Sequence, residues 1–424
     1  MLWLYNFGIT LYGMIIYFVS FFNNKARLFI KGRENIFKII ENHLDKSKKN
    51  VWFHFASLGE FEQGRPVLEA VKNNYPDKGI IVTFFSPSGY EIRKNYALAD
   101  GVFYLPLDTR KNAERFIRLV KPEIAVFTKY EFWHHYFKTL NDQGIPLLMI
   151  SVIFRPDQVF FKWYGGFQRK ILERVSHFFV QNEQSVELLK GININQVSLS
   201  GDTRFDRVAE NAAAPKKLPL IEEFCGGSKV FIAGSTWPQD EVLLADLLKE
   251  NPSWKFIIAP HEIDAGHISQ LLKLMPGALR YTELETGYAG NAETETFATA
   301  ETQPKGQPVS AQLLLIDNIG LLSSVYQYGD IAYIGGGFGA GIHNTLEAAA
   351  FGLPVIFGPE YHKFQEAKDL LALHAAYSIS SLSDLSAAFN KLQKDTNAGL
   401  AASKYVQDKT GSTKQITGYL ENYL

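Results

Sequence analysis

The chain has 424 residues, which suits two to three domains that each bury a core of their own. Its 43 basic and 44 acidic residues leave a net charge of −1, so no bulk positive field favours nucleic-acid binding. The hydrophobic content of 46% excludes wholesale disorder. A single cysteine, Cys225, excludes an intramolecular disulfide and any cysteine-rich metal site, and suits a reducing compartment.

The N-terminal segment, residues 2–22, carries no charged side chain and predicts an apolar helix. Such a helix is ~31 Å long, close to the ~30 Å thickness of a bilayer's hydrocarbon core. Basic residues follow at positions 25–33, and positive charge stays on the cytoplasmic side. We therefore expect residues 1–24 to be a single membrane anchor, with the remaining chain on the cytoplasmic face.

Two other interpretations of this segment stay open. A cleavable signal peptide needs positive charge before the apolar run and a small-residue cleavage site after it. Here the positive charge comes after the run, and Phe21-Phe22-Asn23-Asn24 is a poor cleavage site. A buried or interfacial helix is the other alternative, because Asn6, Thr10 and Ser20 are polar and glycines interrupt the run.

From residue 51 onward, short apolar runs alternate with amphipathic stretches, which is typical of βαβ units. Runs without polar alternation suit parallel strands that are buried on both faces of a sheet. The expected strands are 51–56, 80–85, 124–128, 146–151 and 176–180, then, after a linker at 207–228, 229–234, 255–259, 313–316, 331–336 and 354–358.

This alternation predicts two Rossmann-like domains, over residues 25–210 and 211–404, with a C-terminal helix at 405–424 that packs back on the first domain. Residues 283–312 are poor in bulky apolar side chains and predict a mobile surface insertion. Ligands of such sheets bind at the carboxyl ends of the strands, so we expect the site in a cleft between the domains.

Two carboxylates follow predicted strands of the first domain. Glu60 comes shortly after the first strand and three residues after Ser57, where it could take a proton from an attacking hydroxyl. The alternative is a capping box, in which Ser57 and Glu60 bond each other's backbone N–H groups. Glu131 follows the strand at 124–128, where a glutamate is also a common solvated start of a helix. Arg204 lies in the polar run that closes this half.

In the second half, five glycines in seven residues follow a predicted strand in GGGFGAG (335–341), and a short helix is expected after them. Glycines let the backbone approach a ligand, and a helix N-terminus offers N–H groups to a phosphate. Asn344 and Glu347 fit either a helix cap with its partner or contacts to a ribose. Ser235 and Thr236 stand at another strand–turn–helix junction.

Several common motifs are absent from the sequence. There is no Walker A lysine loop, no HExxH zinc motif and no nucleophile elbow. No Asp-x-Asp occurs, which disfavours a metal-dependent nucleotide-sugar site built on that motif. GGGFGA formally matches a dinucleotide fingerprint, but no acidic residue ends a strand ~20 positions later.

Taken together, these segments resemble the Kdo transferase family, whose members move 3-deoxy-D-manno-oct-2-ulosonic acid (Kdo) from CMP-Kdo to a lipid A precursor in Gram-negative bacteria. The similarity extends from the N-terminus to about residue 375. The segments that carry it are Ser57-Leu58-Gly59-Glu60, Glu131-Phe132-Trp133, Gly201-Asp202-Thr203-Arg204-Phe205-Asp206, Gly234-Ser235-Thr236, Gly341-Ile342-His343-Asn344-Thr345-Leu346-Glu347, Gly358-Pro359 and Phe364.

The sequence departs from the family pattern at four places. Pro-Arg-His of the family is Pro260-His261-Glu262 here, so an arginine expected near the donor phosphate is missing. Met-Gly-Glu-Leu is Ile319-Gly320-Leu321-Leu322, which lacks the glutamate. The family's Asn-Ala-Arg is Ser151-Val152-Ile153, and its Asn before Phe364 is Lys363. Arg155 or Lys363 could supply the missing positive charge.

The resemblance implies a GT-B type glycosyltransferase that binds lipid A precursor, lipid IVA, in its first domain and CMP-Kdo in its second. It implies an inverting transfer with Glu60 as general base and no metal, because the helix after the glycine loop stabilises the phosphate. No cofactor, nucleic acid or protein partner is expected; the partners are CMP-Kdo, the acceptor and inner-membrane lipid. The expected site residues are Glu60 and Glu131 as catalytic groups, and Ser57, Gly59, Arg204, Ser235, Thr236, His261, Gly320, Gly336, Gly337, Gly341, His343, Asn344, Glu347 and Lys363 as substrate or donor ligands.

Two alternatives stay open, a membrane-associated GT-B enzyme that uses a UDP-sugar and a nucleotide-binding relative without turnover.

The anchor hypothesis also makes a prediction. Deleting residues 2–22 is expected to shift the protein toward the soluble fraction, with catalysis on detergent-dispersed acceptor largely surviving.

Overall fold

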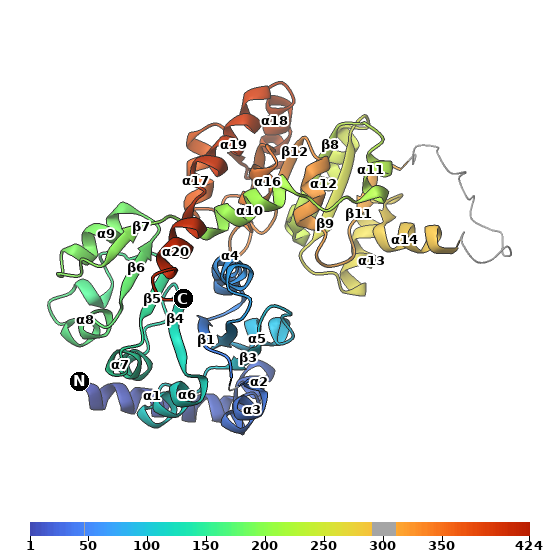
Figure 1. Cartoon of the computed structure of the whole chain (residues 1–424). Helices are drawn as coiled ribbons and strands as arrows, with labels where there is room; N and C mark the ends of the chain where they lie inside the picture. Colours follow the sequence, from blue (N-terminus) through green and yellow to red (C-terminus); the bar gives the residue numbers. More distant parts are fainter. Residues whose placement is uncertain (46, 291–310) are drawn as a thin grey trace. The chain divides into compact units, whose positions relative to one another are not determined.

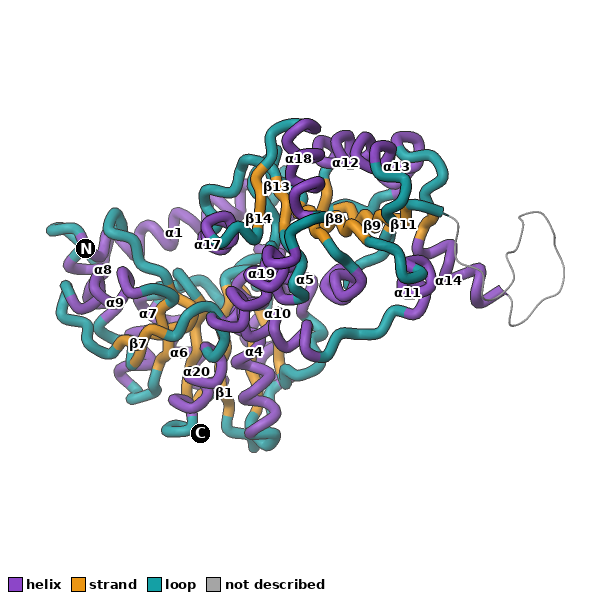
Figure 2. Tube along the Cα trace, turned by 90° about the horizontal axis from the view of Figure 1, so that it is seen from above, coloured by secondary structure: helices purple, strands orange, loops and turns teal. Residues whose placement is uncertain are grey.

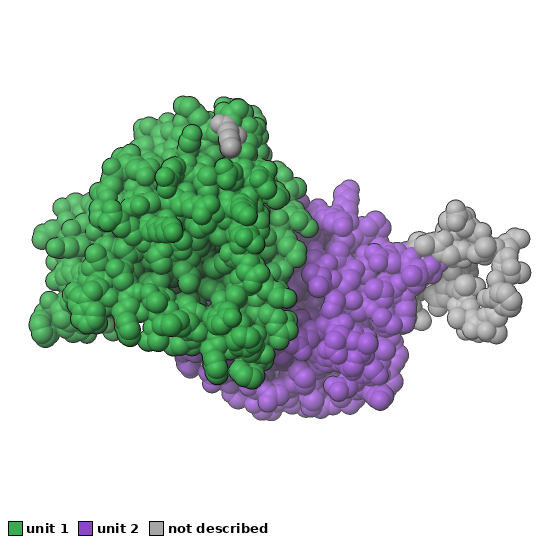
Figure 3. All heavy atoms as spheres, turned by 90° about the horizontal axis from the view of Figure 1, so that it is seen from below, with its two compact units in different colours: residues 1–206, 409–424 green, residues 207–408 purple. Residues whose placement is uncertain are grey.

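The structure, a computed structural model, describes residues 1–45, 47–290 and 311–424. These residues form two compact units, Met1–Asp206 together with Lys409–Leu424, and Arg207–Asp408 (Figure 3). The divisions fall a few residues from the boundaries expected at 210 and 404.

Unit 1 is built on a parallel seven-stranded sheet in the order β3-β2-β1-β4-β5-β6-β7. Its strands are β1 (Asn50–Phe55), β2 (Gly79–Phe84), β3 (Gly101–Tyr104), β4 (Pro122–Thr128), β5 (Leu147–Val152), β6 (His177–Val180) and β7 (Val197–Leu199). Successive residues of β1 point to opposite faces, so Val51, Phe53 and Phe55 join one core cluster while Trp52 joins another. The sheet is therefore buried on both faces, as its apolar runs predict.

Helices cover both faces of this sheet (Figures 1 and 2). Those of unit 1 are α1 (Leu2–Val19), α2 (Asn24–Lys31), α3 (Ile36–His43), α4 (Leu58–Asn74), α5 (Pro87–Arg93), α6 (Arg110–Val120), α7 (His134–Asp142), α8 (Gly166–Leu172), α9 (Glu183–Lys190) and α20 (Ser412–Leu420), with a 3-10 turn η1 (Val159–Phe161). The C-terminal helix α20 contacts α4, and its Ile416 and Leu420 join the core cluster of Val51.

Unit 2 repeats this architecture around a parallel sheet in the order β10-β11-β9-β8-β12-β13-β14. Its strands are β8 (Val230–Thr236), β9 (Lys255–Pro260), β10 (Leu279–Arg280), β11 (Leu313–Leu315), β12 (Ile331–Ile334), β13 (Val355–Phe357) and β14 (Ala376–Ser378). Its helices are α11 (Pro219–Cys225), α12 (Pro238–Glu250), α13 (Ala265–Leu274), α14 (Tyr281–Gly290), α15 (Leu322–Val325), η2 (Tyr326–Tyr328), α16 (Leu346–Ala350), α17 (Gln365–Ala372), α18 (Leu382–Leu392) and α19 (Thr396–Asp408). Helix α10 (Thr203–Ala213) crosses the division between the units.

The fold class expected from the sequence is confirmed, but several elements differ. The strands β3, β7, β10 and β14 were not expected; each has two to four residues, too few for a clear pattern. The expected linker at 207–228 is partly helical, since it holds the end of α10 and all of α11. The surface insertion expected at 283–312 begins inside helix α14, and its residues 291–310 lie outside the described part of the chain.

The N-terminal helix α1 has two distinct sides. Its inner stripe contacts unit 1: the Tyr5 hydroxyl donates to Asp108, Asn6 Oδ1 lies 2.7 Å from His135 Nε2, and Tyr12 stacks on Phe85. Its outer stripe leaves large apolar side chains exposed, with Trp3 at 69%, Phe7 at 57% and Phe18 at 66%. By length and composition, α1 is one candidate membrane-spanning helix among the described residues, and none of it is buried within the protein.

Candidate active site

The first carboxylate, Glu60, lies in the first turn of α4, just beyond the end of β1. The Ser57 hydroxyl donates a short hydrogen bond to Glu60 Oε2 instead of accepting one from the backbone. The alternative capping box is therefore wrong, because neither side chain bonds a backbone N–H group of the other. Gly59 between them is exposed, and Glu60 is half-buried, so this carboxylate is open to a substrate.

The second carboxylate, Glu131, follows β4, which is the direct neighbour of β1 in the sheet. Its Oε2 accepts two hydrogen bonds, from Trp133 Nε1 at 2.8 Å and from His54 Nε2 at 3.1 Å. Glu131 is thus held by specific donors and is not a freely solvated start of a helix. Because parallel neighbouring strands end at the same edge, Glu60 and Glu131 share the carboxyl edge of the unit 1 sheet.

His54 is a member of this group that the sequence analysis missed. It is fully buried in β1, and its Nδ1 lies 2.8 Å from Thr83 Oγ1. Trp52 Nε1 donates to the same hydroxyl, and the other ring nitrogen of His54, Nε2, faces Glu131. A histidine inside the apolar run VWFHF was the available signal, because a buried polar ring needs hydrogen-bond partners.

Arg204 lies beyond β7, in the first turn of α10. Its guanidinium pairs with the buried carboxylate of Asp202, with Nη2 at 2.8 Å and Nε at 2.9 Å. Gln63 of α4 donates to the same carboxylate. In unit 1 Arg204 therefore helps fix the start of α10 against α4.

In unit 2, the predicted residues at the ends of β8 and β9 lie beside a stack of three rings. Trp237 stacks on His261 with 4.8 Å between centroids, and His261 stacks on His343 with 4.4 Å between centroids. Trp237 Nε1 donates to His343 Nε2 at 3.0 Å. Burial, and the nearby His261, lower the pKa of His343 to about 4, so this ring is neutral at pH 7.

Ser235 and Thr236 form the carboxyl end of β8, next to the three stacked rings. Ser235 adopts a left-handed backbone conformation with φ of 55°. Thr236 is fully buried, and its hydroxyl donates to Glu241 at 2.9 Å, so that hydroxyl is already engaged. Trp237, which was not among the predicted site residues, is half-buried in this turn, whereas Thr236 is fully buried.

The glycine loop after β12 is packed against neighbouring backbone. A Cβ on Gly337 would lie 2.6 Å from the Gly358 Cα, and Gly336 has a φ of 90°. The buried carboxylate of Asp240 accepts from Gly336 N at 2.9 Å and from the Tyr333 hydroxyl at 2.6 Å. Two of these glycines are therefore required by the fold itself, whether or not a ligand approaches them.

This packing gives a direct prediction. Gly337→Ala forces backbone apart and is expected to destabilise unit 2 by about 1–3 kcal/mol, as overpacking does. The matched control is Gly339→Ala in the same loop, where the added Cβ would meet nothing closer than 3.8 Å. Thermal unfolding of the two variants decides the matter: equal melting temperatures would contradict the packing argument.

Asn344 and Glu347 lie at the start of α16, which begins at Leu346 and has only five residues. Asn344 accepts from Leu346 N at 3.1 Å and donates to Glu347 Oε1 at 3.0 Å. Burial raises the pKa of Glu347, while Asn344 and the nearby Arg207 counteract that rise. A five-residue helix aligns few peptide dipoles, so the helix expected to stabilise a phosphate is weaker than the sequence suggested.

The remaining predicted residues lie in loops of unit 2. Gly341 closes the glycine loop with a φ of 131°, and Gly320 has a φ of 95° in the turn after β11. Lys363 is exposed between β13 and α17. The structure therefore gathers the candidates into two groups, one at the carboxyl edge of each sheet.

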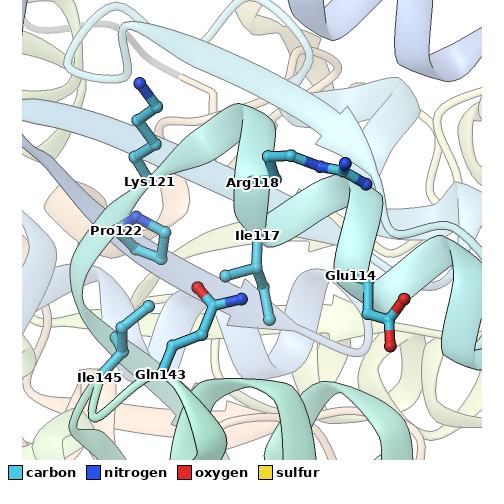
Figure 4. A pocket seen from close by; sticks show the side chains of 7 residues that line it. All are labelled: Glu114, Ile117, Arg118, Lys121, Pro122, Gln143 and Ile145. Carbon is cyan, nitrogen blue, oxygen red and sulfur yellow. The ribbon is translucent and has the colours of Figure 1, made fainter.

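A pocket of about 550 Å³ in unit 1 lies away from these groups (Figure 4). Its lining includes Lys121 and Pro122 at the amino end of β4, and Ile145 just before β5. It therefore opens at the opposite edge of the sheet from Glu60 and Glu131. Among the described residues, no group of three or more His, Cys, Asp or Glu side chains is arranged to hold a metal ion.

Comparison with known proteins is consistent with these features. Residues 31–207 match the family model described as 3-deoxy-D-manno-octulosonic-acid transferase (kdotransferase). A 3-deoxy-D-manno-octulosonic acid transferase of Rickettsia bellii is 26% identical over 427 residues, covering 96% of this chain and 91% of the relative. Over most of its length the chain is thus similar to members of the Kdo transferase family. Another relative of that name, from Aquifex aeolicus, is also 26% identical, over 78% of this chain and 82% of its own length.

Solved structures show the same GT-B fold. A UDP-GlcNAc 2-epimerase from Neisseria meningitidis has a TM-score of 0.58 at 14% identity, covering 88% of this chain and 100% of the epimerase. MurG from Acinetobacter baumannii has a TM-score of 0.52 at 11% identity, covering 88% of this chain and 99% of MurG. At these identities the likeness concerns the fold alone.

Proposed function

We propose that this chain is a glycosyltransferase of lipopolysaccharide synthesis that moves Kdo from CMP-Kdo to a lipid A precursor of the lipid IVA type. The observation that carries the proposal is the position of Glu60 just beyond the carboxyl end of β1, where its carboxylate does not cap the backbone of α4. The similarity of the chain to Kdo transferases supports the same reaction. The GT-B fold supplies a second Rossmann-like unit in which a nucleotide can be held.

In the proposed reaction, Glu60 accepts the proton of the acceptor hydroxyl as its oxygen attacks the anomeric carbon of Kdo. The bond from that carbon to the CMP phosphate oxygen breaks, and CMP leaves with the electron pair. Attack from the face opposite the leaving group inverts the anomeric centre. Glu131, fixed by Trp133 and His54 at the same sheet edge, is placed to orient the acceptor or to stabilise the positive charge of the sugar.

The donor site is proposed in unit 2, around the ends of β8, β9 and β12. Backbone N–H groups of the glycine loop would receive the CMP phosphate, and Glu347 would bond the ribose hydroxyls. His261 follows Pro260 where the family pattern has its arginine, and its ring stacks on Trp237, so aromatic stacking is available where that charge is missing. Exposed Lys363 is the proposed source of positive charge.

The role of Glu347 is open to measurement. Glu347→Ala is expected to weaken CMP binding by about 1–3 kcal/mol, the value of a hydrogen bond to a charged group. Glu360→Ala is the matched control, because this exposed glutamate lies in the loop beside Gly337 without a role in the proposal. Isothermal titration with CMP checks both variants, and unchanged affinity in a folded Glu347→Ala variant would leave Glu347 as a partner of Asn344 only.

For membrane attachment, the docking of α1 favours a helix that lies in the interface over one that spans the bilayer. Tyr5 and Asn6 bond Asp108 and His135 of unit 1, so a spanning orientation would carry these polar groups into hydrocarbon. With α1 flat, its outer apolar stripe reaches lipid while unit 1 stays on the cytoplasmic face. This arrangement would keep the acceptor site beside the membrane in which the lipid acceptor resides.

The choice of donor separates the proposal from its alternatives. Purified full-length protein is titrated calorimetrically with CMP and with UDP, with and without a chelator. Preference for CMP supports the proposal; preference for UDP would favour another GT-B enzyme that uses a UDP-sugar. CMP binding without turnover of CMP-Kdo would favour a non-catalytic relative. Loss of turnover in the chelator would contradict the proposed independence from metal.

A further inference from the structure

Helix α1 contacts the aromatic residues that lie next to Glu131. The ring of Tyr12 stacks on Phe85, with 6.1 Å between centroids and 26° between planes. Phe85 in turn packs on Trp133, with centroids 4.8 Å apart. Trp133 Nε1 then donates to Glu131 Oε2 at 2.8 Å. A continuous line of contacts therefore joins the membrane-facing helix to a carboxylate of the candidate site.

A second set of contacts fixes the backbone of the same segment. The Tyr5 hydroxyl accepts from His134 N at 3.2 Å and donates to Asp108. Asp108 is buried and also accepts from the backbone N–H groups of His135 and Tyr136, each at 3.0 Å. The N-terminus of α7, directly after Trp133, is thus held by a carboxylate that α1 covers.

Phe85 links Tyr12 to Trp133 and is also contacted by Arg33 and Phe29. Arg33 donates to the carbonyl oxygens of Phe85 and Leu105, each at 2.8 Å, and its guanidinium lies 5.2 Å from the centre of the Phe85 ring. Phe29 packs on Phe85 edge-to-face at 5.3 Å. These contacts fix the backbone of Phe85 and one side of its ring, so the position of the ring against Trp133 still depends on its stacking with Tyr12.

We propose that α1 is a positioning element of the acceptor site, in which Tyr12 acts through Phe85 and Trp133 to hold Glu131. Docking of α1 on unit 1 then sets the orientation of the carboxylate, in addition to any attachment of the protein to lipid. This inference rests on the proposed function for its kinetic consequence, but not for the structural coupling itself. It also replaces the expectation that catalysis survives deletion of residues 2–22.

The test compares two tyrosines of the same helix. Tyr12→Ala removes the inner ring contact, whereas Tyr17→Ala removes an exposed ring whose aromatic contact is with Phe21 of the same segment. With detergent-dispersed acceptor, Tyr12→Ala is expected to lower kcat about tenfold, as for a weakened hydrogen bond to a carboxylate, with KM for CMP-Kdo unchanged. Tyr17→Ala is expected to match wild type.

A double-mutant cycle shows whether the effect passes through Trp133. Trp133→Phe keeps a ring against Phe85 but removes the N–H bond to Glu131, so kcat falls by about tenfold or more. Adding Tyr12→Ala to Trp133→Phe should then cost little further. If the two effects multiply, or if Tyr12→Ala and Tyr17→Ala have equal kcat, the proposed route is wrong.

Hydrogen exchange provides a readout that needs no turnover. Amides of residues 129–142 should exchange faster in Tyr12→Ala than in wild type or Tyr17→Ala, because Phe85 then supports Trp133, directly before α7, less firmly. Unchanged exchange overturns the coupling whatever the enzyme's reaction is. Faster exchange in a protein that does not turn over CMP-Kdo would support the coupling and refute the proposed function instead.

Discussion

We expect the Glu60→Gln variant to lose ~10²–10⁴ in kcat for Kdo transfer, because an amide cannot accept the proton of the acceptor hydroxyl. CMP binding should be unchanged, since the proposed donor site lies in unit 2. The melting temperature should stay close to that of wild type, because Glu60 bonds the Ser57 hydroxyl and does not cap the backbone of α4. Steady-state kinetics, calorimetry and thermal unfolding measure the three quantities separately.

The control for this variant is Glu69→Gln on the same helix. Glu69 pairs with Arg65 at 2.6 Å and accepts from the Tyr96 hydroxyl, away from the end of β1. It should keep kcat within a few-fold of wild type. If Glu60→Gln also keeps kcat within a few-fold, Glu60 is not the base, and Glu131 becomes the next candidate.

A second large effect is expected on the outer stripe of α1. Replacing Trp3, Phe7 and Phe18 together by serine removes three exposed apolar side chains that each contribute about 1.5–3 kcal/mol when buried in lipid. Binding to vesicles should fall by about a hundredfold or more. Activity on detergent-dispersed acceptor should survive, because the inner stripe that contacts unit 1 is untouched.

Vesicle flotation measures this partition, and a matched triple variant controls for lost surface hydrophobicity. Val242, Leu373 and Leu400 are exposed apolar residues of unit 2, at 53%, 46% and 68%. Their replacement by serine should leave flotation unchanged. Wild-type flotation of the α1 variant would show that attachment occurs elsewhere.

Much of the architecture could be predicted because parallel strands that are buried on both faces consist of consecutive apolar residues. The run VWFHFA at 51–56 contains nearly all of β1, and PVIFG at 354–358 contains all of β13. Edge strands such as β7 leave a weaker pattern, since one side of them meets solvent or a loop. The two Rossmann-like domains therefore followed from the alternation of elements and the GT-B type from the family resemblance, while the number of strands per sheet followed from neither.

The candidate site was predictable in its positions but not in its contacts. That Glu60 and Glu131 follow strands is visible in the sequence, whereas the bond from His54 to Glu131 joins residues 77 apart and depends on the pairing of β1 with β4. The same holds for the glycine loop. Its composition suggested a ligand, yet position 337 requires glycine because the backbone of Gly358 leaves no room for a Cβ atom.

The most direct test of the central claim is turnover by the purified full-length protein with CMP-Kdo and a tetra-acylated lipid A precursor. Mass spectrometry of the lipid and release of CMP are followed together, in wild type and in Glu60→Gln. We predict a lipid product heavier by one or more Kdo residues, formed with matching CMP release in wild type and nearly absent in the variant. An unmodified acceptor in wild type, or transfer from a UDP-sugar but not from CMP-Kdo, would contradict the account.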